Sequence, residues 1–159
     1  MTKFLLGLLT LMTTLVIGGI MLFQQSVTPL YQVEAETSEY AKEHADIIQV
    51  NDFYWYNGTE ESYYTVDGFN SDAERQIVLV RQSDGHVETY NYDSTVSEYD
   101  AYHQVMTEAS PSKLLNMRIG MTDDGTPMWE ASFKDEHGKM GYYYIHLETG
   151  EVLEKITNL

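Results

Sequence analysis

The fold of this chain is decided by a hairpin pattern at residues 76–92, which read QIVLVRQSDGHVETYNY. β-Branched and aromatic residues fill two short runs, Gln76 to Arg81 and Val87 to Tyr92, and the pair Asp84-Gly85 lies between them. Because Asp-Gly favours a tight turn between antiparallel strands, this pattern predicts a β-hairpin. The same alternation of short runs and turn pairs continues on both sides.

Six further runs have the composition of strands. Before the hairpin we expect strands at Ile48 to Tyr56 and at Ser62 to Val66, ended by the pairs Asn57-Gly58 and Asp67-Gly68. After it we expect four strands, at Leu114 to Met121, Pro127 to Phe133, Tyr142 to Leu147 and Val152 to Ile156. Glycine-containing turns separate these four, at Asp124-Gly125, His137-Gly138 and Thr149-Gly150.

A helical pattern precedes each group of strands. Residues from about Leu30 to Ile47 have apolar side chains at helical spacing. Ser94 to Glu108 has the same spacing, with a stripe formed by Val96, Tyr99, Tyr102, His103 and Met106. A shift of 65 positions superposes Val80 to Val87 on Ile145 to Val152. We therefore expect an α+β protein of two duplicated units, 28–93 and 94–159, each a helix on an antiparallel sheet and packed against the other.

The N-terminal segment from Phe4 to Phe23 contains no charged residue. As a helix it would extend about 30 Å, the thickness of the hydrocarbon core of a bilayer. Bulky residues at Ile20 to Gln25 occupy the place of a small-residue cleavage site, so we expect residues 1–27 to form an uncleaved anchor. Lys3 precedes the span and the next basic residue is Lys42, which predicts a cytoplasmic N-terminus and an extracellular C-terminal domain at the cell membrane.

The composition excludes some partners and scaffolds. The formal net charge is -16, and such a surface repels polyanions, so nucleic acid is not an expected partner. The chain has no cysteine, which excludes disulfide stabilisation of an exported domain and is typical of a bacterium without a dedicated periplasm.

No familiar catalytic or metal-binding motif occurs in the sequence. It contains neither the G-x-S-x-G frame of a serine hydrolase nor the H-E-x-x-H or C-x-x-C spacing of a zinc site. The five histidines are scattered, at His44, His86, His103, His137 and His146. We therefore expect a protein that is not an enzyme, with no metal, no cofactor and no small-molecule substrate.

The density of tyrosine, 13 residues of 159, is the most informative feature of the composition. In a strand beginning at Tyr142, Tyr143 shares one face with Ile145 and Leu147, while Tyr142, Tyr144 and His146 share the other. Exposed tyrosines are typical of protein interfaces because they combine a large apolar ring with a polar tip. Tyr142, Tyr144 and His146 are thus a candidate protein-interaction surface, unless the second helix or the other half of the chain covers them.

Small residues recur within the predicted span. Thr10, Thr14 and Gly18 are spaced by four and share one helix face, where another spanning helix could approach closely. Small residues are also common in spanning helices without such a contact. The three form a candidate transmembrane helix contact.

The aromatic and glycine patterns resemble those of a known family. Residues 63–68 read YYTVDG and residues 129–150 read WEASFKDEHGKMGYYYIHLETG, after a short N-terminal anchor. This combination resembles the TseB-like (YpmB) proteins of Gram-positive bacteria, with His146 at a position where that pattern leads us to expect Asp. The resemblance implies two tandem cystatin-like or PepSY-like domains and a non-enzymatic regulator of cell wall elongation that acts through a membrane-anchored penicillin-binding protein.

Three functions therefore compete. The leading one is a module that binds a penicillin-binding protein or another wall-synthesis protein. The first rival is a PepSY-type inhibitor or chaperone of an exported protease, and the second is a small-molecule sensor or an undetected hydrolase. Enrichment of a wall synthase on crosslinking favours the first, inhibition of a protease favours the second, and a concave pocket with converging polar groups favours the third.

Overall fold

The computed structural model describes Met12, Val16 and residues 31–159. The chain divides into two compact units, residues 1–36 and 37–159. The second unit contains both β-sheets of the described chain and their core.

The predicted membrane span, Phe4 to Phe23, lies outside the described residues apart from Met12 and Val16. The same holds for the three residues of the candidate helix contact, Thr10, Thr14 and Gly18. Residues 12, 16 and 31–159 contain no helix of the length and apolarity that a membrane crossing requires.

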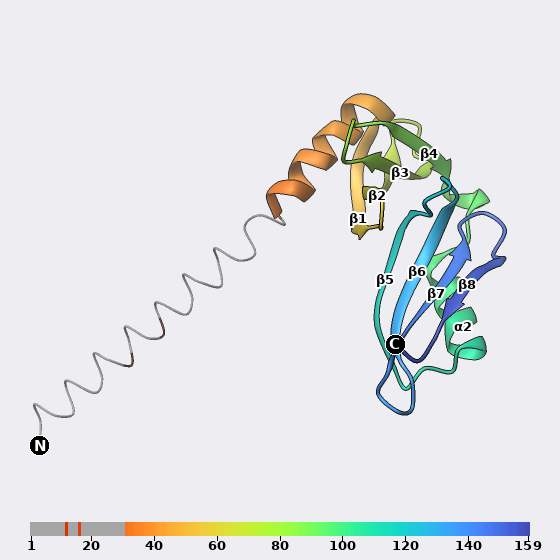
Figure 1. The fold of residues 1–159 in the computed structure, drawn as a ribbon. Helices are drawn as coiled ribbons and strands as arrows, with labels where there is room; N and C mark the ends of the chain where they lie inside the picture. Colours follow the sequence, from red (N-terminus) through yellow and green to blue (C-terminus); the bar gives the residue numbers. More distant parts are fainter. Residues whose placement is uncertain (1–11, 13–15, 17–30) are drawn as a thin grey trace, which may run out of the picture. The chain divides into compact units, whose positions relative to one another are not determined.

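The second unit is an α+β structure with two four-stranded antiparallel sheets (Figure 1). Residues 37–45 are helical and lead into the first sheet, whose strands are adjacent in chain order. These strands are β1 (Ile47–Asn57), β2 (Ser62–Asn70), β3 (Arg75–Arg81) and β4 (Val87–Asn91). The hairpin predicted from residues 76–92 is confirmed as β3 and β4, with Gly85 in the turn at φ 74°.

The helical residues 37–45 pack on one face of the first sheet. Ala41 is fully buried and lies in a small cluster with side chains from β1, β2 and β3, namely Ile47, Val66, Val78 and Val80. Successive residues of β2 and β3 alternate between this cluster and the opposite face, as the period of two predicts.

One predicted turn is wrong. Asp67-Gly68 was expected to end a strand, but β2 continues through both residues to Asn70. A Cβ at Gly68 would lie 2.4 Å from the carbonyl oxygen of Gln49 on β1, where the strand pairing is irregular. Gly68 therefore allows two strands to approach closely rather than forming a turn, and the chain reverses after Asn70 instead.

The second half contains a short 3-10 helix, an α-helix and the second sheet. The elements are η1 (Tyr92–Ser94), α2 (Glu98–Glu108), β5 (Lys113–Met121), β6 (Pro127–Lys134), β7 (Met140–His146) and β8 (Val152–Ile156), with the four strands adjacent in chain order. The Ser97 hydroxyl accepts the backbone N–H of Asp100 at 3.1 Å, which fixes the start of α2. The three predicted turns between the strands are confirmed.

The predicted apolar stripe of the second helix is wrong at Tyr99, Tyr102 and His103, whereas Val96, just before α2, packs against the core. Tyr99 and Tyr102 are 69% and 39% exposed, and His103 is exposed as well. The buried side chains of α2 are Ala101 and Val105, which are small enough to let the helix lie close to the second sheet. The aromatic residues of α2 therefore face solvent.

The two sheets share one hydrophobic core. β5, an edge strand of the second sheet, packs against the face of the first sheet opposite residues 37–45. The Thr65 hydroxyl donates to the buried carbonyl of Ile119 at 3.1 Å, and the rings of Tyr54 and Trp129 meet edge to face with centroids 5.5 Å apart. Each half of the chain contributes one sheet. The boundaries of the two predicted units, 28–93 and 94–159, stay a prediction.

Candidate protein-interaction face

Strand β7 places the three candidate residues on one side of the second sheet. Tyr142, Tyr144 and His146 are half-buried there. Tyr143 and Ile145 point the other way into the core, where α2 lies and the Tyr143 hydroxyl donates to Glu108. Helix α2 therefore does not cover the candidate residues, and their role in binding stays a prediction.

We call the side of the second sheet that faces away from α2 the outer face. Its side chains come from all four strands, at positions that the strand register aligns: Arg118 on β5, Glu130 on β6, Tyr142, Tyr144 and His146 on β7, and Glu154 and Ile156 on β8. Strand β6 is buried on both sides along almost its whole length, so the outer face lies on a rigid base.

The three candidate side chains have different surroundings. The rings of Tyr142 and Tyr144 are stacked, with centroids 6.4 Å apart and planes at 10°. The His146 ring is engaged by the turn that follows it, because its Nδ1 accepts the backbone N–H of Glu148 at 3.1 Å. The outer face thus presents the two tyrosines as a pair, and His146 shapes the turn beside them.

A buried ion pair lies at the centre of the outer face. Glu130 is only 4% exposed, and its Oε1 accepts the Nε of Arg118 at 2.7 Å and lies 2.6 Å from a terminal guanidinium nitrogen. The strand register puts Arg118, Glu130 and Tyr144 in one row across β5, β6 and β7. Burial raises the pKa of the Tyr144 hydroxyl, and the negative charge of Glu130 raises it further, so Tyr144 is a neutral hydrogen-bonding group at physiological pH.

The first half of the chain adds one aromatic ring to this face. Tyr56, at the end of β1, lies so close to Gly120 of β5 that a Cβ at position 120 would be 2.2 Å from the ring's Cγ. The Arg118 guanidinium carbon is 5.8 Å from the centroid of the same ring. Desolvation by burial raises the pKa of Tyr56 to about 12, with smaller contributions from Glu130 and Asp123. Tyr56 therefore joins the two halves at the outer face.

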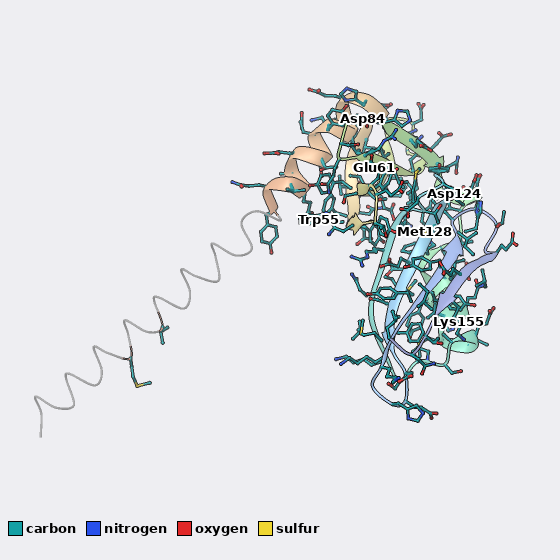
Figure 2. The ribbon with its side chains drawn as sticks, viewed as in Figure 1. Trp55, Glu61, Asp84, Asp124, Met128 and Lys155 are labelled. Carbon is teal, nitrogen blue, oxygen red and sulfur yellow. The ribbon has the colours of Figure 1, made fainter. Side chains whose placement is uncertain are left out.

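A pocket of about 210 Å³ opens beside Tyr56. It is lined by residues of the β1–β2 turn, the β5–β6 turn and the outer face: Tyr56, Thr59, Thr122, Asp123, Met128, Tyr144, Glu154 and Ile156. Figure 2 labels Met128 in this lining and Asp124 in the adjoining turn, both at one end of the second sheet, with Lys155 farther from that end. We call this the tyrosine pocket.

The first sheet has its own ion pair and a second hollow. Asp67, 2% exposed, accepts the Nε and a terminal nitrogen of Arg75 at 2.8 and 2.6 Å, and the Arg75 guanidinium lies 3.7 Å from the Tyr92 ring centroid. A cavity of about 400 Å³ borders Arg75 and Tyr92. Because the Arg75 guanidinium is already engaged by a carboxylate and a ring, this arrangement serves to fix β2, β3 and η1 together.

The described residues give no sign of a metal centre. Across residues 31–159, no group of three or more histidine, cysteine, aspartate or glutamate side chains is placed to hold a metal ion. The outer face offers aromatic rings, hydroxyl groups and carboxylates, and of these groups the tyrosines are enriched at protein interfaces.

Among the residues of this face that the sequence analysis did not identify are Arg118, Glu130 and Tyr56. A signal for the ion pair was present, because Arg118 and Glu130 lie equally far from Asp124 in the predicted β5–β6 turn and must face each other in a regular hairpin. The sequence contains no such signal for Tyr56, because its contact with Gly120 depends on how the two sheets pack.

Three comparisons bear on the family. The model of the cell wall elongation regulator TseB-like domain matches residues 36–81 of this chain. No curated protein matches the chain. Among solved structures, the YpmB protein from Bacillus subtilis superposes with a TM-score of 0.66 and 25% sequence identity, over 79% of this chain and 96% of that one. The sequence match over β1 to β3 and the superposition over most of both chains agree, and both support a similarity of this chain to the TseB-like (YpmB) family.

Proposed function

We propose that this protein is a membrane-anchored, non-enzymatic regulator of cell wall elongation whose outer face binds a penicillin-binding protein. The observation that carries the proposal is the pair Tyr142 and Tyr144, which is stacked beside the buried Arg118–Glu130 ion pair on a face that α2 leaves open. The family match supports a role in cell wall elongation.

The outer face has the physical properties of a binding surface. Tyrosine contributes a large apolar area at low conformational cost and keeps a hydroxyl for hydrogen bonding, and burial at an interface strengthens both contributions. The rings project from β7, which pairs with β6, and β6 is buried on both sides, so little conformational freedom is lost when a partner docks. Glu130 is already paired with Arg118, so docking does not leave its charge without a partner.

The anchor is the second part of the proposal. We propose that residues Phe4 to Phe23 cross the cell membrane with the N-terminus in the cytoplasm, and that residues 28–93 and 94–159 form two cystatin-like or PepSY-like units outside. Tethering a regulator and a wall synthase to one membrane raises their effective concentration, so a weak contact suffices. Thr10, Thr14 and Gly18 would add a contact between spanning helices.

Crosslinking followed by co-purification tests the proposal. Full-length protein would be expressed in a Gram-positive host, crosslinked in intact cells and purified from membranes, with an unrelated single-span protein as the control. We expect a penicillin-binding protein to be enriched over that control. If no wall synthase is enriched while the protein is present in the membrane, the proposed function is wrong.

A further inference from the structure

The tyrosine pocket indicates which kind of side chain the protein partner places in it. This inference rests on the proposed function, because it requires that such a partner exists. The pocket takes residues from both halves of the chain and lies at one end of the outer face. Its volume of about 210 Å³ is below the 300 Å³ at which pockets for free small molecules begin. It is therefore large enough for one long side chain of a docked protein and too small for most free ligands.

The rim of the pocket is acidic. Asp123, in the β5–β6 turn, and Glu154, on β8, both line the pocket and are exposed. Over residues 31–159, neither carboxylate accepts a hydrogen bond or forms an ion pair. Arg118, whose guanidinium carbon is 5.8 Å from the centroid of the Tyr56 ring, is already paired with Glu130. Two carboxylates without partners at the mouth of one pocket favour a positively charged occupant.

Part of the pocket lining is apolar and aromatic. Met128 is 1% exposed and forms the lining together with Ile156, while the rings of Tyr56 and Tyr144 contribute two aromatic walls. This combination suits a side chain with an aliphatic stem and a charged tip, because the stem packs on the apolar atoms and the tip stays at the acidic rim. The carboxylates add to the effect of burial, which raises the pKa of Tyr56 and Tyr144, so both hydroxyl groups stay protonated and can donate hydrogen bonds.

We infer that the tyrosine pocket receives an arginine side chain of the protein partner. Lysine shares the aliphatic stem and the charge, but the planar guanidinium also stacks on aromatic rings and donates to two carboxylates at once. Arginine is enriched at protein interfaces, whereas lysine is depleted there. The strongly acidic composition of the chain, with a net charge of -16, attracts a basic segment of the partner to the same site.

Binding of a blocked amino acid tests the pocket without the partner. The probe is N-acetyl-arginine methylamide, and the signal is the NMR shift of the Met128 methyl group in detergent-solubilised full-length protein. We expect saturable binding with a dissociation constant of about 1–10 mM, which is ordinary for a single side chain. The uncharged citrulline analogue should bind at least about fivefold more weakly. Equal binding of citrulline, tighter binding of the lysine analogue, or no shift of Met128 would overturn the inference.

Charge-removing variants complete the test. Asp123→Asn combined with Glu154→Gln keeps the shape of the pocket and should weaken arginine binding at least about fivefold. Glu136→Gln, an exposed change in the turn at the other end of the second sheet, is the matched control and should bind like the wild type. Equal binding by the double variant and the control would also overturn the inference.

Co-purification separates this inference from the proposed function. If the wild-type protein and the double variant Asp123→Asn, Glu154→Gln enrich a penicillin-binding protein equally, the proposed function stands and the arginine pocket is wrong. If the wild-type protein enriches no wall synthase, the proposed function is wrong, and the arginine titration alone decides whether the pocket binds a cationic side chain.

Discussion

The ring of Tyr56 lies against the backbone of Gly120, so closely that a Cβ at position 120 would be 2.2 Å from Cγ of the ring. Tyr56 ends β1 in the first half of the chain, and Gly120 lies in β5 in the second half. One glycine thus lets the first sheet place an aromatic side chain on the outer face of the second, where it forms a wall of the tyrosine pocket.

Gly120→Ala should destabilise the protein because the new methyl group overlaps the Tyr56 ring. Forcing a methyl group into such a contact costs about 1–3 kcal/mol. Urea denaturation of the full-length protein measures the change in the free energy of unfolding. The control is the same substitution in a Tyr56→Ala background, where the ring is absent and the cost should fall below about 1 kcal/mol. An equal cost in both backgrounds would show that the ring contact is not its source.

Glu130→Gln should destabilise the fold more than any change at the exposed rim. It removes the charge that compensates Arg118 while the guanidinium stays in place, and breaking one side of a buried pair costs about 3 kcal/mol or more. Glu154→Gln, an exposed change on the same face, should stay within about 0.5 kcal/mol of the wild type. Chemical denaturation compares the two, and similar free energies of unfolding would contradict a structural role for the ion pair.

Much of the secondary structure could be predicted from the sequence because its determinants are local. Alternating residues and glycine-containing turn pairs identified the eight strands found within residues 31–159, and the alternation in β7 placed Tyr142 and Tyr144 together on one face. The failures have a common cause. The role of Gly68 depends on its close approach to Gln49 of a neighbouring strand, and the side of α2 that is buried depends on the sheet against which the helix packs. Neither can be inferred from residues nearby in the sequence.

On the outer face, too, contacts within one strand could be predicted from the periodicity of the sequence, whereas contacts between separate elements could not. Neighbours within one strand follow from periodicity, whereas the meeting of Arg118 and Glu130 follows only when the register of the β5–β6 hairpin is used as well. Tyr56 reaches Gly120 through the packing of two sheets. Contacts between elements far apart in the sequence are invisible to a pattern with a period of two or 3.6.

The protein should lose stability as the pH rises from about 10 to about 12. Burial raises the pKa of Tyr56 from 10.0 to about 12, and it raises that of Tyr143 to about 12 as well. The folded state therefore keeps these protons at a pH where the unfolded chain has released them. Their stabilising contribution is complete below pH 10 and is lost as the pH passes through the folded pKa values.

Urea denaturation at pH 9 to 12 measures this loss, with absorbance near 295 nm reporting tyrosinate formation. Tyr56→Phe retains the ring and removes the ionisable group, so it should reduce the loss between pH 10 and 12. A wild-type protein whose free energy of unfolding is unchanged over this range would contradict the burial of these hydroxyl groups.

Tyr142→Ala combined with Tyr144→Ala should lower the recovery of the crosslinked penicillin-binding protein at least about tenfold, because tyrosines near the centre of an interface carry much of its energy. Both side chains are half-buried, so the variant needs a check of its thermal unfolding. Tyr99→Ala and Tyr102→Ala on the exposed side of α2 form the matched control and should leave recovery unchanged. Equal losses in the two double variants would argue against a contact specific to the outer face.

The central claim is that the outer face of the second sheet contacts a penicillin-binding protein, and photocrosslinking at single positions tests it most directly. A photoreactive phenylalanine analogue would replace Tyr142 on the outer face or Tyr99 on α2 in full-length protein in intact cells, and mass spectrometry would identify the crosslinked peptides. The account predicts peptides of a penicillin-binding protein joined to position 142 and not to position 99. Crosslinks to such a protein from position 99 alone, or from neither position, would contradict it.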